Sequence, residues 1–319
     1  MKPLLALVAL ALAVVQPALA EQFPDRPVRV VVPYSAGGTS DAAARLAAEP
    51  LARQLGQSVY VENRPGAGGM IGTQAFFTLP PDGYTLLVIA AGTVGIIPAA
   101  KPVSFVPERD LVPLGGIWLS PQLLAVRNSF GPKTVQEFVA YAKANPGKIN
   151  IASAGNGTLT HMSGELLKRE AGIELTHVPF RSTGDTQAAL LGGQIDALFG
   201  DVAILQPQIQ SGQIRPLAVA ATKRSPLQPN LMTMVEAGLS GVVASNWFGF
   251  AVSSKTPAPV IAYLKSAIAK MQAEPAYREA LEKRGVSVGD PGAEAFGAMV
   301  DREIKQWRSL ISASKIKID

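Results

Sequence analysis

The chain has 319 residues, a formal net charge of +5 and no cysteine. The absence of cysteine excludes disulfides, thiolate chemistry and a lipoprotein anchor. The Lys and Arg residues are scattered, with neither a basic run nor interleaved aromatic residues, so the sequence gives no support for nucleic-acid binding. A weak positive excess would instead help to attract anions.

Residues 1–20 have the pattern of a secretory signal peptide. Lys2 precedes an apolar run over residues 4–15, and an Ala-Leu-Ala sequence ends at Ala20. The run is shorter than the roughly 20 residues that a membrane span needs. We expect cleavage before Glu21 and export to the periplasm; an uncleaved anchor is the alternative. The mature chain, with 28 Lys and Arg against 24 acidic residues, would carry about +4 and is long enough for two domains.

Short β-branched runs alternate with longer helical patterns, which predicts an α/β fold with mainly parallel sheets flanked by helices. Strands are predicted at residues 28–32, 58–61, 84–89, 123–126, 149–153, 175–178, 197–199, 214–220 and 248–252. Helices are predicted at residues 41–55, 135–144, 159–171, 186–191, 257–272, 275–284 and 293–312. Pro50 should kink or restart the first helix, because proline lacks the N–H that a helix interior uses.

No internal repeat and no low-complexity linker divides the chain into two consecutive halves. We therefore expect discontinuous lobes, with residues 21–122 and 251–319 in lobe 1 and residues 123–250 in lobe 2. The chain would enter the second lobe at Leu123 and return along the strand that ends at Val252. Two crossings form a hinge, about which the lobes could close on a ligand.

Two glycine-rich loops each follow a strand and open a helix. In residues 33–41, glycines permit positive φ and outward-facing N–H groups, and Thr39 or Ser40 can cap the helix, which indicates a small anion site. Residues 152–158 repeat the arrangement ahead of His161. Loops at the carboxyl ends of parallel strands form ligand crevices. A plain turn is the alternative for the first loop, and a structural histidine is the alternative for His161.

Residues 62–72 form a third glycine-rich loop, but Ile71 stands where a dinucleotide fingerprint requires glycine. We interpret this loop as a tight turn, with cleft lining as the alternative, and expect no cofactor. The two histidines, His161 and His177, lie in no metal-binding or nucleophile-elbow motif, so neither an enzyme nor a metal site is expected. A hydrolase that uses Ser153 and His161 is the enzymatic alternative.

Together the motifs resemble one family, the substrate-binding receptors of tripartite tricarboxylate transporters, also called Bug proteins. The landmarks are residues 33–41, 62–69, 82–87, 145–150, 153–161, 177–180, 190–196 and 236–238. The resemblance spans nearly the whole mature chain. It implies a periplasmic, two-lobed Venus-flytrap fold that holds a carboxylate largely through backbone N–H groups and water.

The loops and the resemblance together predict a ligand-binding set from both lobes. Its members are Tyr34, Ser35, Gly37, Gly38, Thr39, Ser153, Gly155, Thr158, His161, Thr183, Gly184 and Asp201. The implied function is a monomeric receptor that delivers a small organic acid to integral-membrane transporter subunits. A periplasmic sensor that feeds a two-component system is the alternative.

The chain departs from the family pattern after residues 177–180, where Ser-Thr-Gly-Asp-Thr replaces a frequent Gly-x-Gly-Pro-Ala. If Asp185 and Asp201 face the cleft, they would repel a second carboxylate and favour a neutral or cationic group. A solvated helix-cap aspartate is the alternative for Asp185. Residues 92–105 also lack the family's usual Asn and Tyr, and Trp307 is predicted to pack in the core.

Overall fold

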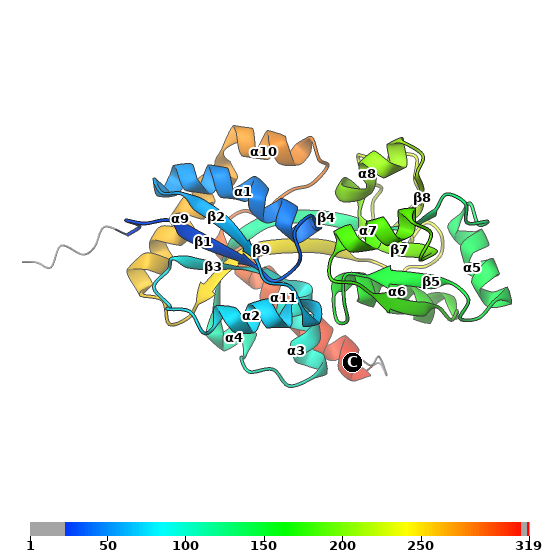
Figure 1. Cartoon of the computed structure of the whole chain (residues 1–319), viewed down its shortest axis with the longest axis horizontal. Coiled ribbons are helices and arrows are strands. Elements are labelled where there is room, and N and C mark those ends of the chain that lie inside the picture. Colours follow the sequence, from blue (N-terminus) through cyan, green and yellow to red (C-terminus); the bar gives the residue numbers. More distant parts are fainter. Residues whose placement is uncertain (1–22, 314–317, 319) are drawn as a thin grey trace, which may run out of the picture.

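The computed structural model describes residues 23–313 and residue 318, so the predicted signal peptide lies outside the described residues. Two long antiparallel strands, β4 (Leu111–Arg127) and β9 (Ser245–Ser253), run through the middle of the molecule and connect its two lobes (Figure 1). The predicted two-lobed α/β fold is confirmed. Among the described residues, no helix is long and apolar enough to cross a membrane.

Buried valine and leucine runs build the sheet of the first lobe. β1 (Val28–Val32) lies parallel to β2 (Val59–Asn63) and β3 (Thr85–Ala90), and β3 pairs antiparallel with β9. Every residue of β3 is buried, which is typical of a strand covered on both faces. The longer helices of this lobe are α1 (Thr39–Leu55), α2 (Met70–Phe76), α9 (Ala258–Ala273), α10 (Pro275–Glu282) and α11 (Ala293–Ala313). Shorter helical segments are η1 (Ala67–Gly69), η2 (Gly92–Ile96), α3 (Ile97–Ala100) and α4 (Pro107–Asp110).

The second lobe repeats the parallel arrangement with β5 (Asn150–Ser153) between β6 (Thr176–Pro179) and β7 (Ala197–Asp201). β4 pairs with β9 as far as Pro121 and with β7 and β8 (Ile214–Val219) beyond it. One strand therefore belongs to both lobes. The helices of this lobe are α5 (Val135–Ala144), α6 (Leu159–Ala171), α7 (Thr183–Leu191) and α8 (Val202–Gln210).

The sequence predictions missed α2 and α8, and three further differences have a clear physical reason. α1 continues through Pro50 to Leu55 without a restart; Pro50 is buried, so core packing offsets the hydrogen bond that proline removes. α7 begins at Thr183 rather than at residue 186, because the Ser182 hydroxyl accepts a hydrogen bond from the N–H of Asp185 and caps the helix. The strand predicted at residues 123–126 is the end of the much longer β4, whose early part is stabilised by pairing with β9.

Glycines in the two central strands allow α11 to pack directly against them. A Cβ atom on Gly249 in β9 would collide with the ring of Phe296 and with the carbonyl oxygen of Gly115. Phe296 is itself buried in the core, and so is Trp307 on the same helix, as predicted. The distance between helix and strand is therefore set by the absence of a side chain at position 249.

We predict that Gly249→Ala destabilises the protein by about 2 kcal/mol or more, because the added methyl group overpacks a closed contact. Gly297→Ala is the matched control, since a Cβ atom there has no neighbour within 4 Å and the residue lies inside α11. The control should be neutral or slightly stabilising, because alanine favours helices over glycine. Urea unfolding of both variants tests this prediction, and equal stabilities would contradict it.

Candidate functional site

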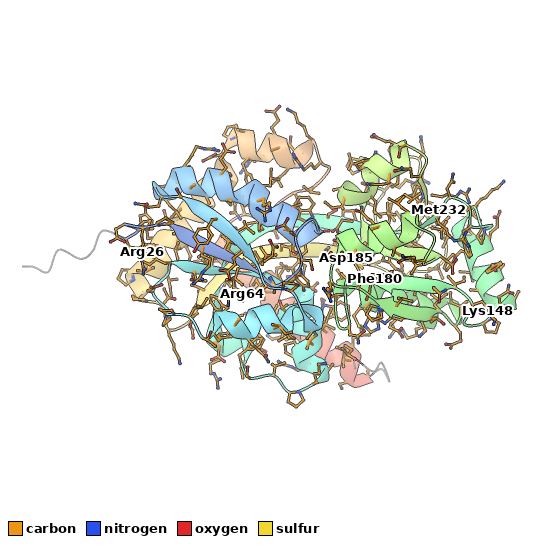
Figure 2. All side chains as sticks on the ribbon, in the orientation of Figure 1. Arg26, Arg64, Lys148, Phe180, Asp185 and Met232 are labelled. Carbon is orange, nitrogen blue, oxygen red and sulfur yellow. The ribbon has the colours of Figure 1, made fainter. Side chains whose placement is uncertain are left out.

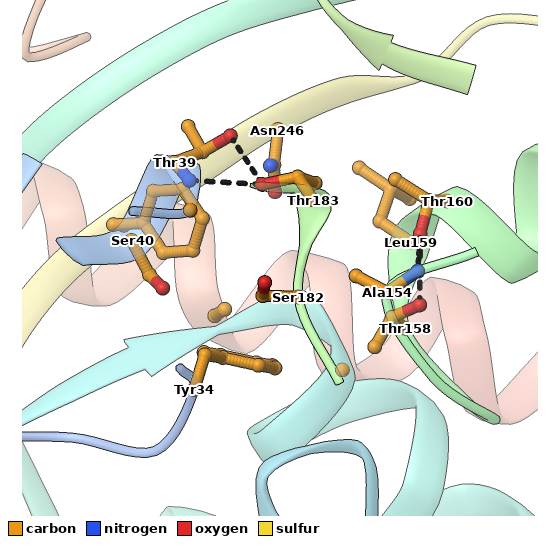
Figure 3. Close-up of a pocket in the computed structure, with 14 residues that line it drawn as sticks. Tyr34, Thr39, Ser40, Ala154, Thr158, Leu159, Thr160, Ser182, Thr183 and Asn246 are labelled. Carbon is orange, nitrogen blue, oxygen red and sulfur yellow. Dashed lines mark hydrogen bonds between the residues drawn. The ribbon is translucent and has the colours of Figure 1, made fainter. Parts of the chain in front are cut away.

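A narrow cavity of about 30 Å³ lies where the two lobes meet β9 (Figure 3). None of the described residues that line it has a charged side chain. The lining residues are Tyr34, Gly38, Thr39, Ser40, Ala90, Gly92, Ala154, Thr158, Leu159, Thr160, Ser182, Thr183, Asn246 and Phe248. Hydroxyl and amide groups on a largely apolar wall can bind a small polar ligand without an ion pair.

Asp41 shapes the first glycine loop from inside. Its carboxylate accepts hydrogen bonds from the N–H of Gly37 at 3.0 Å, from Asn63 Nδ2 at 3.0 Å and from Arg45 Nε at 3.0 Å. Burial raises the pKa of Asp41, but the bonds from Arg45, Gly37 and Asn63 outweigh it, so the pKa lies below its ordinary value. Asp41 is therefore ionised and stabilises the loop through these hydrogen bonds. The Gly37 N–H is already engaged by it.

The N-terminus of α1 is capped from the other lobe. Its N-cap residue, Gly38, has no side chain, and the N–H of Thr39 donates to Thr183 Oγ1 at 2.9 Å (Figure 3). The hydroxyl oxygens of Thr39 and Thr183 lie 3.2 Å apart. A Cβ atom on Gly38 would come within 3.1 Å of Thr183 Oγ1. These contacts fix the closed spacing of the lobes at the cavity.

The second glycine loop is held by its own hydroxyl groups. Thr158 Oγ1 donates to the carbonyl oxygen of Gly155 at 2.7 Å and accepts from the N–H of His161 as the cap of α6. The N–H of Ala154 donates to Thr160 Oγ1 at 3.0 Å. The neighbouring hydroxyl groups of Thr158 and Thr160 therefore replace backbone partners that a buried loop otherwise lacks.

Both histidines lie behind this loop, with their rings stacked 4.0 Å apart at 14°. His177 Nε2 lies 2.6 Å from Ser153 Oγ, and His161 Nδ1 accepts from the N–H of Gly157 at 3.2 Å. Burial lowers the pKa of each ring to about 4, so both are neutral at pH 7. Ser153 is thus partnered by His177 rather than by His161, and neither lines the cavity.

The predicted ligand-binding set divides into two groups. Tyr34, Gly38, Thr39, Thr158 and Thr183 line the cavity. The remaining members lie outside its lining: Ser35, Gly37, Ser153, Gly155, His161, Gly184 and Asp201. Asp185 is exposed in the first turn of α7, near the junction of the lobes (Figure 2), and Asp201 is buried behind Thr39 and Asn246.

Several lining residues were absent from the prediction. Ser40, Ala154, Leu159, Thr160 and Ser182 are sequence neighbours of predicted residues, so a wider window around each loop would have found them. Asn246 and Phe248 come from β9, which enters the site through long-range strand pairing. No local sequence signal marks those two positions.

The third glycine loop, interpreted as a tight turn, also lies across the lobe junction. Gly68 has φ +63°, and a Cβ atom there would collide with the carbonyl oxygen of Asn156 in the second loop. A Cβ atom on Gly92 would come within 3.1 Å of the carbonyl oxygen of Gly157, and Gly155 lies in ordinary contact distance of Gly68. The lobes therefore meet along a glycine seam, formed by residues 68, 92, 155 and 157, in which backbone contacts backbone.

Two lobes joined by a pair of strands, with a cavity between them, define a solute-binding protein of the periplasmic-binding-protein class. The chain belongs to the tripartite tricarboxylate transporter receptor family, because the family model "Tripartite tricarboxylate transporter family receptor" matches residues 43–316. The predicted resemblance is thereby confirmed.

Three solved structures are similar over most of their length. The periplasmic binding protein BugD is 34% identical with a TM-score of 0.88, over 92% of this chain and 99% of its own. MatC from Rhodopseudomonas palustris, solved with malate, is 33% identical with a TM-score of 0.86, over 91% of this chain and 100% of its own. Rpa4515 of R. palustris, solved with adipate, is 29% identical with a TM-score of 0.86, over 91% of this chain and 97% of its own.

The stacked histidines predict an acid-sensitive fold. In the unfolded chain they take up protons near their ordinary pKa of 6.5, whereas in the folded protein they do so only near pH 4. The stability that they contribute is therefore complete above pH 6.5 and is lost as the pH falls toward 4. Urea unfolding midpoints at pH 7 and pH 4.5 measure this loss. A double variant, His161→Gln with His177→Gln, should show a smaller difference between the two pH values; an unchanged difference would contradict the assignment.

Proposed function

We propose that this protein is a periplasmic receptor that captures a small carboxylated solute between its lobes and delivers it to the membrane subunits of a tripartite tricarboxylate-type transporter. The proposal includes export through a cleaved signal peptide and action as a monomer. It also retains the lobe boundaries expected from the sequence, with residues 123–250 as the second lobe. The change in β4 pairing at Pro121 supports the first of these boundaries.

One observation carries the carboxylate assignment. The hydroxyl groups of Tyr34, Ser40 and Ser182 line the cavity, and none of them donates a hydrogen bond to another described residue. Burial raises the pKa of Tyr34, so its hydroxyl stays protonated and can donate. A carboxylate offers about four acceptor positions, which suits three converging donors.

The first turn of α1 adds to this donor set. Ser40 lies in that turn, where backbone N–H groups have no partner within the helix and the helix dipole favours negative charge. The carboxylates bound by the relatives, malate and adipate, agree with such a site. The cavity would thus bind an anion through neutral donors, in keeping with the absence of Lys, Arg and His from its lining.

Binding would favour the closed state because the ligand contacts groups from both lobes. Tyr34 and Ser40 belong to the first lobe and Ser182 to the second, so one carboxylate can bridge them. A ligand shifts an open–closed equilibrium only by the difference between its affinities for the two states. The glycine seam allows these groups to approach closely enough for that difference to be large.

A thermal-shift screen against a panel of small mono-, di- and tricarboxylates tests the proposed function. A ligand that binds the folded state alone raises the melting temperature as its concentration exceeds Kd. We expect at least one acid to do so, with isothermal titration calorimetry giving one site per chain. If no acid on the panel raises the melting temperature, the carboxylate assignment is wrong.

We further predict that Gly68→Ala weakens binding of the acid found in this screen by about tenfold or more, because the added methyl group holds the lobes apart at Asn156. Gly56→Ala is the matched control. It has nearly the same backbone conformation, φ +66° against +63°, but a Cβ atom there has no neighbour within 4 Å. The control should lose about 1 kcal/mol of stability and keep its affinity. Equal affinities in the two variants would contradict closure along the seam.

A further inference from the structure

A buried carboxylate stands directly behind one end of the cavity. Asp201 ends β7 and is 1% exposed; its Oδ2 accepts a hydrogen bond from Asn246 Nδ2 at 3.2 Å. Asp201 Oδ1 is buried and has no partner among the described residues. A buried acidic group that is only partly satisfied is expensive to keep, which calls for a reason beyond packing.

Asp201 determines which way the Asn246 side chain faces. A carboxylate oxygen only accepts hydrogen bonds, so the amide must turn its Nδ2 toward Asp201. Its Oδ1 then lies on the other branch of the planar amide. No described residue donates to this Oδ1, and it is not among the fully buried unpaired atoms, so it is open to the cavity that Asn246 lines. Asn246 Oδ1 thus offers a hydrogen-bond acceptor to a ligand in the cavity.

The orientation of Asn246 follows from the ionised form of Asp201. Burial raises the pKa of Asp201 to about 7, while hydrogen bonds from Thr39 and Asn246 act in the opposite direction. Above this pKa the carboxylate only accepts hydrogen bonds, so Asn246 Nδ2 faces Asp201 and the Asn246 carbonyl faces the cavity.

Thr39 and Thr183 at the same end are engaged with each other. Their hydroxyl oxygens lie 3.2 Å apart, so one hydroxyl donates to the other. The Thr183 oxygen in turn accepts from the Thr39 N–H. Figure 3 shows Thr39, Thr183 and Asn246 grouped at one end, with Tyr34 and Ser182 away from them. The cavity thus has a donor end and an acceptor end.

We infer that the site selects acids with one carboxylate and a hydrogen-bond donor, such as a hydroxyl or ammonium group, at the far end, and that Asp201 is the positioning residue for this selection. The inference rests on the proposed function, which supplies the carboxylate at the Tyr34 end. A second carboxylate at the far end would meet the Asn246 carbonyl and the Asp201 charge without a donor or a cation to pair with it.

Matched ligand pairs test the inference on the wild-type protein. 4-Hydroxybutyrate and succinate share a four-carbon chain and differ in one end group, and 5-hydroxyvalerate and glutarate repeat the comparison with five carbons. Calorimetry should give a Kd for the better hydroxy acid that is at least about tenfold lower than that of its matched dicarboxylate. Tighter binding of the dicarboxylate in both pairs would overturn the inference and leave the proposed function intact. If no carboxylate binds, the proposed function itself fails.

Variants of Asp201 separate positioning from a purely structural role. Asp201→Asn keeps a carbonyl acceptor for Asn246 Nδ2 and should retain the preference for the hydroxy acid within about threefold. Asp201→Leu removes the acceptor and frees the amide to rotate, so the ratio of the two Kd values should fall toward one. Asp185→Asn, the same charge change at an exposed site, is the control and should leave the ratio unchanged.

Asn246→Ala provides a second route if Asp201→Leu does not fold. It removes the acceptor itself and should lower the same ratio while Asp201 remains in place. Circular dichroism and thermal melting establish that each variant is folded before its affinities are compared. An unchanged ratio in folded Asp201→Leu or in Asn246→Ala would overturn the role assigned to this end of the cavity.

Discussion

The close approach of backbone to backbone across the lobe junction is the constraint on which the site depends. At Gly68 the chain has positive φ and a Cβ atom would collide with the carbonyl oxygen of Asn156, and Gly92 faces the carbonyl oxygen of Gly157. A side chain at position 68 would hold the two loops apart and separate the donors of one lobe from those of the other. The glycines thus serve less to make the loops mobile than to bring two rigid loops together. Glycine loses more conformational entropy on folding than other residues, so this close approach lowers the stability of the folded protein.

The ionisable groups near the cavity are either compensated by hydrogen bonds or kept neutral. An ionised Asp41 in the first turn of α1 would oppose anion binding, but Arg45 Nε contacts both of its oxygens and Asn63 donates to it as well. Its charge is therefore largely compensated before a ligand arrives. The nearby histidines are kept neutral by burial, with a smaller contribution from Lys168 to both rings and from His161 to His177. The cavity then presents hydroxyl groups and amides rather than full charges, which lowers the desolvation cost of binding a small anion.

Local patterns predicted the parts of this structure that are local in origin. Buried β-branched runs, loops 33–41 and 152–158 and most helices could be located because each depends on residues close in sequence. Asn246, Phe248 and the length of β4 could not, because they depend on antiparallel pairing between segments more than 100 residues apart. The sequence also did not indicate which aspartates are buried. Asp185 is exposed to solvent, whereas Asp201 is buried in the core.

The path of β9 explains why the acceptor end lies where it does. Asn246 pairs opposite Ser120 in β4, just before β4 passes from the first sheet to the second. Gln122 then pairs opposite Asp201, which places the Asp201 carboxylate beside the crossing strands. A residue at this crossing moves little when two lobes rotate about it, whereas Tyr34 and Ser182 lie on opposite lobes. Asn246 can therefore select the far end of the ligand from a fixed position. The contacts of the ligand carboxylate with Tyr34 and Ser182 form only when the lobes close, so they favour the closed conformation over the open one.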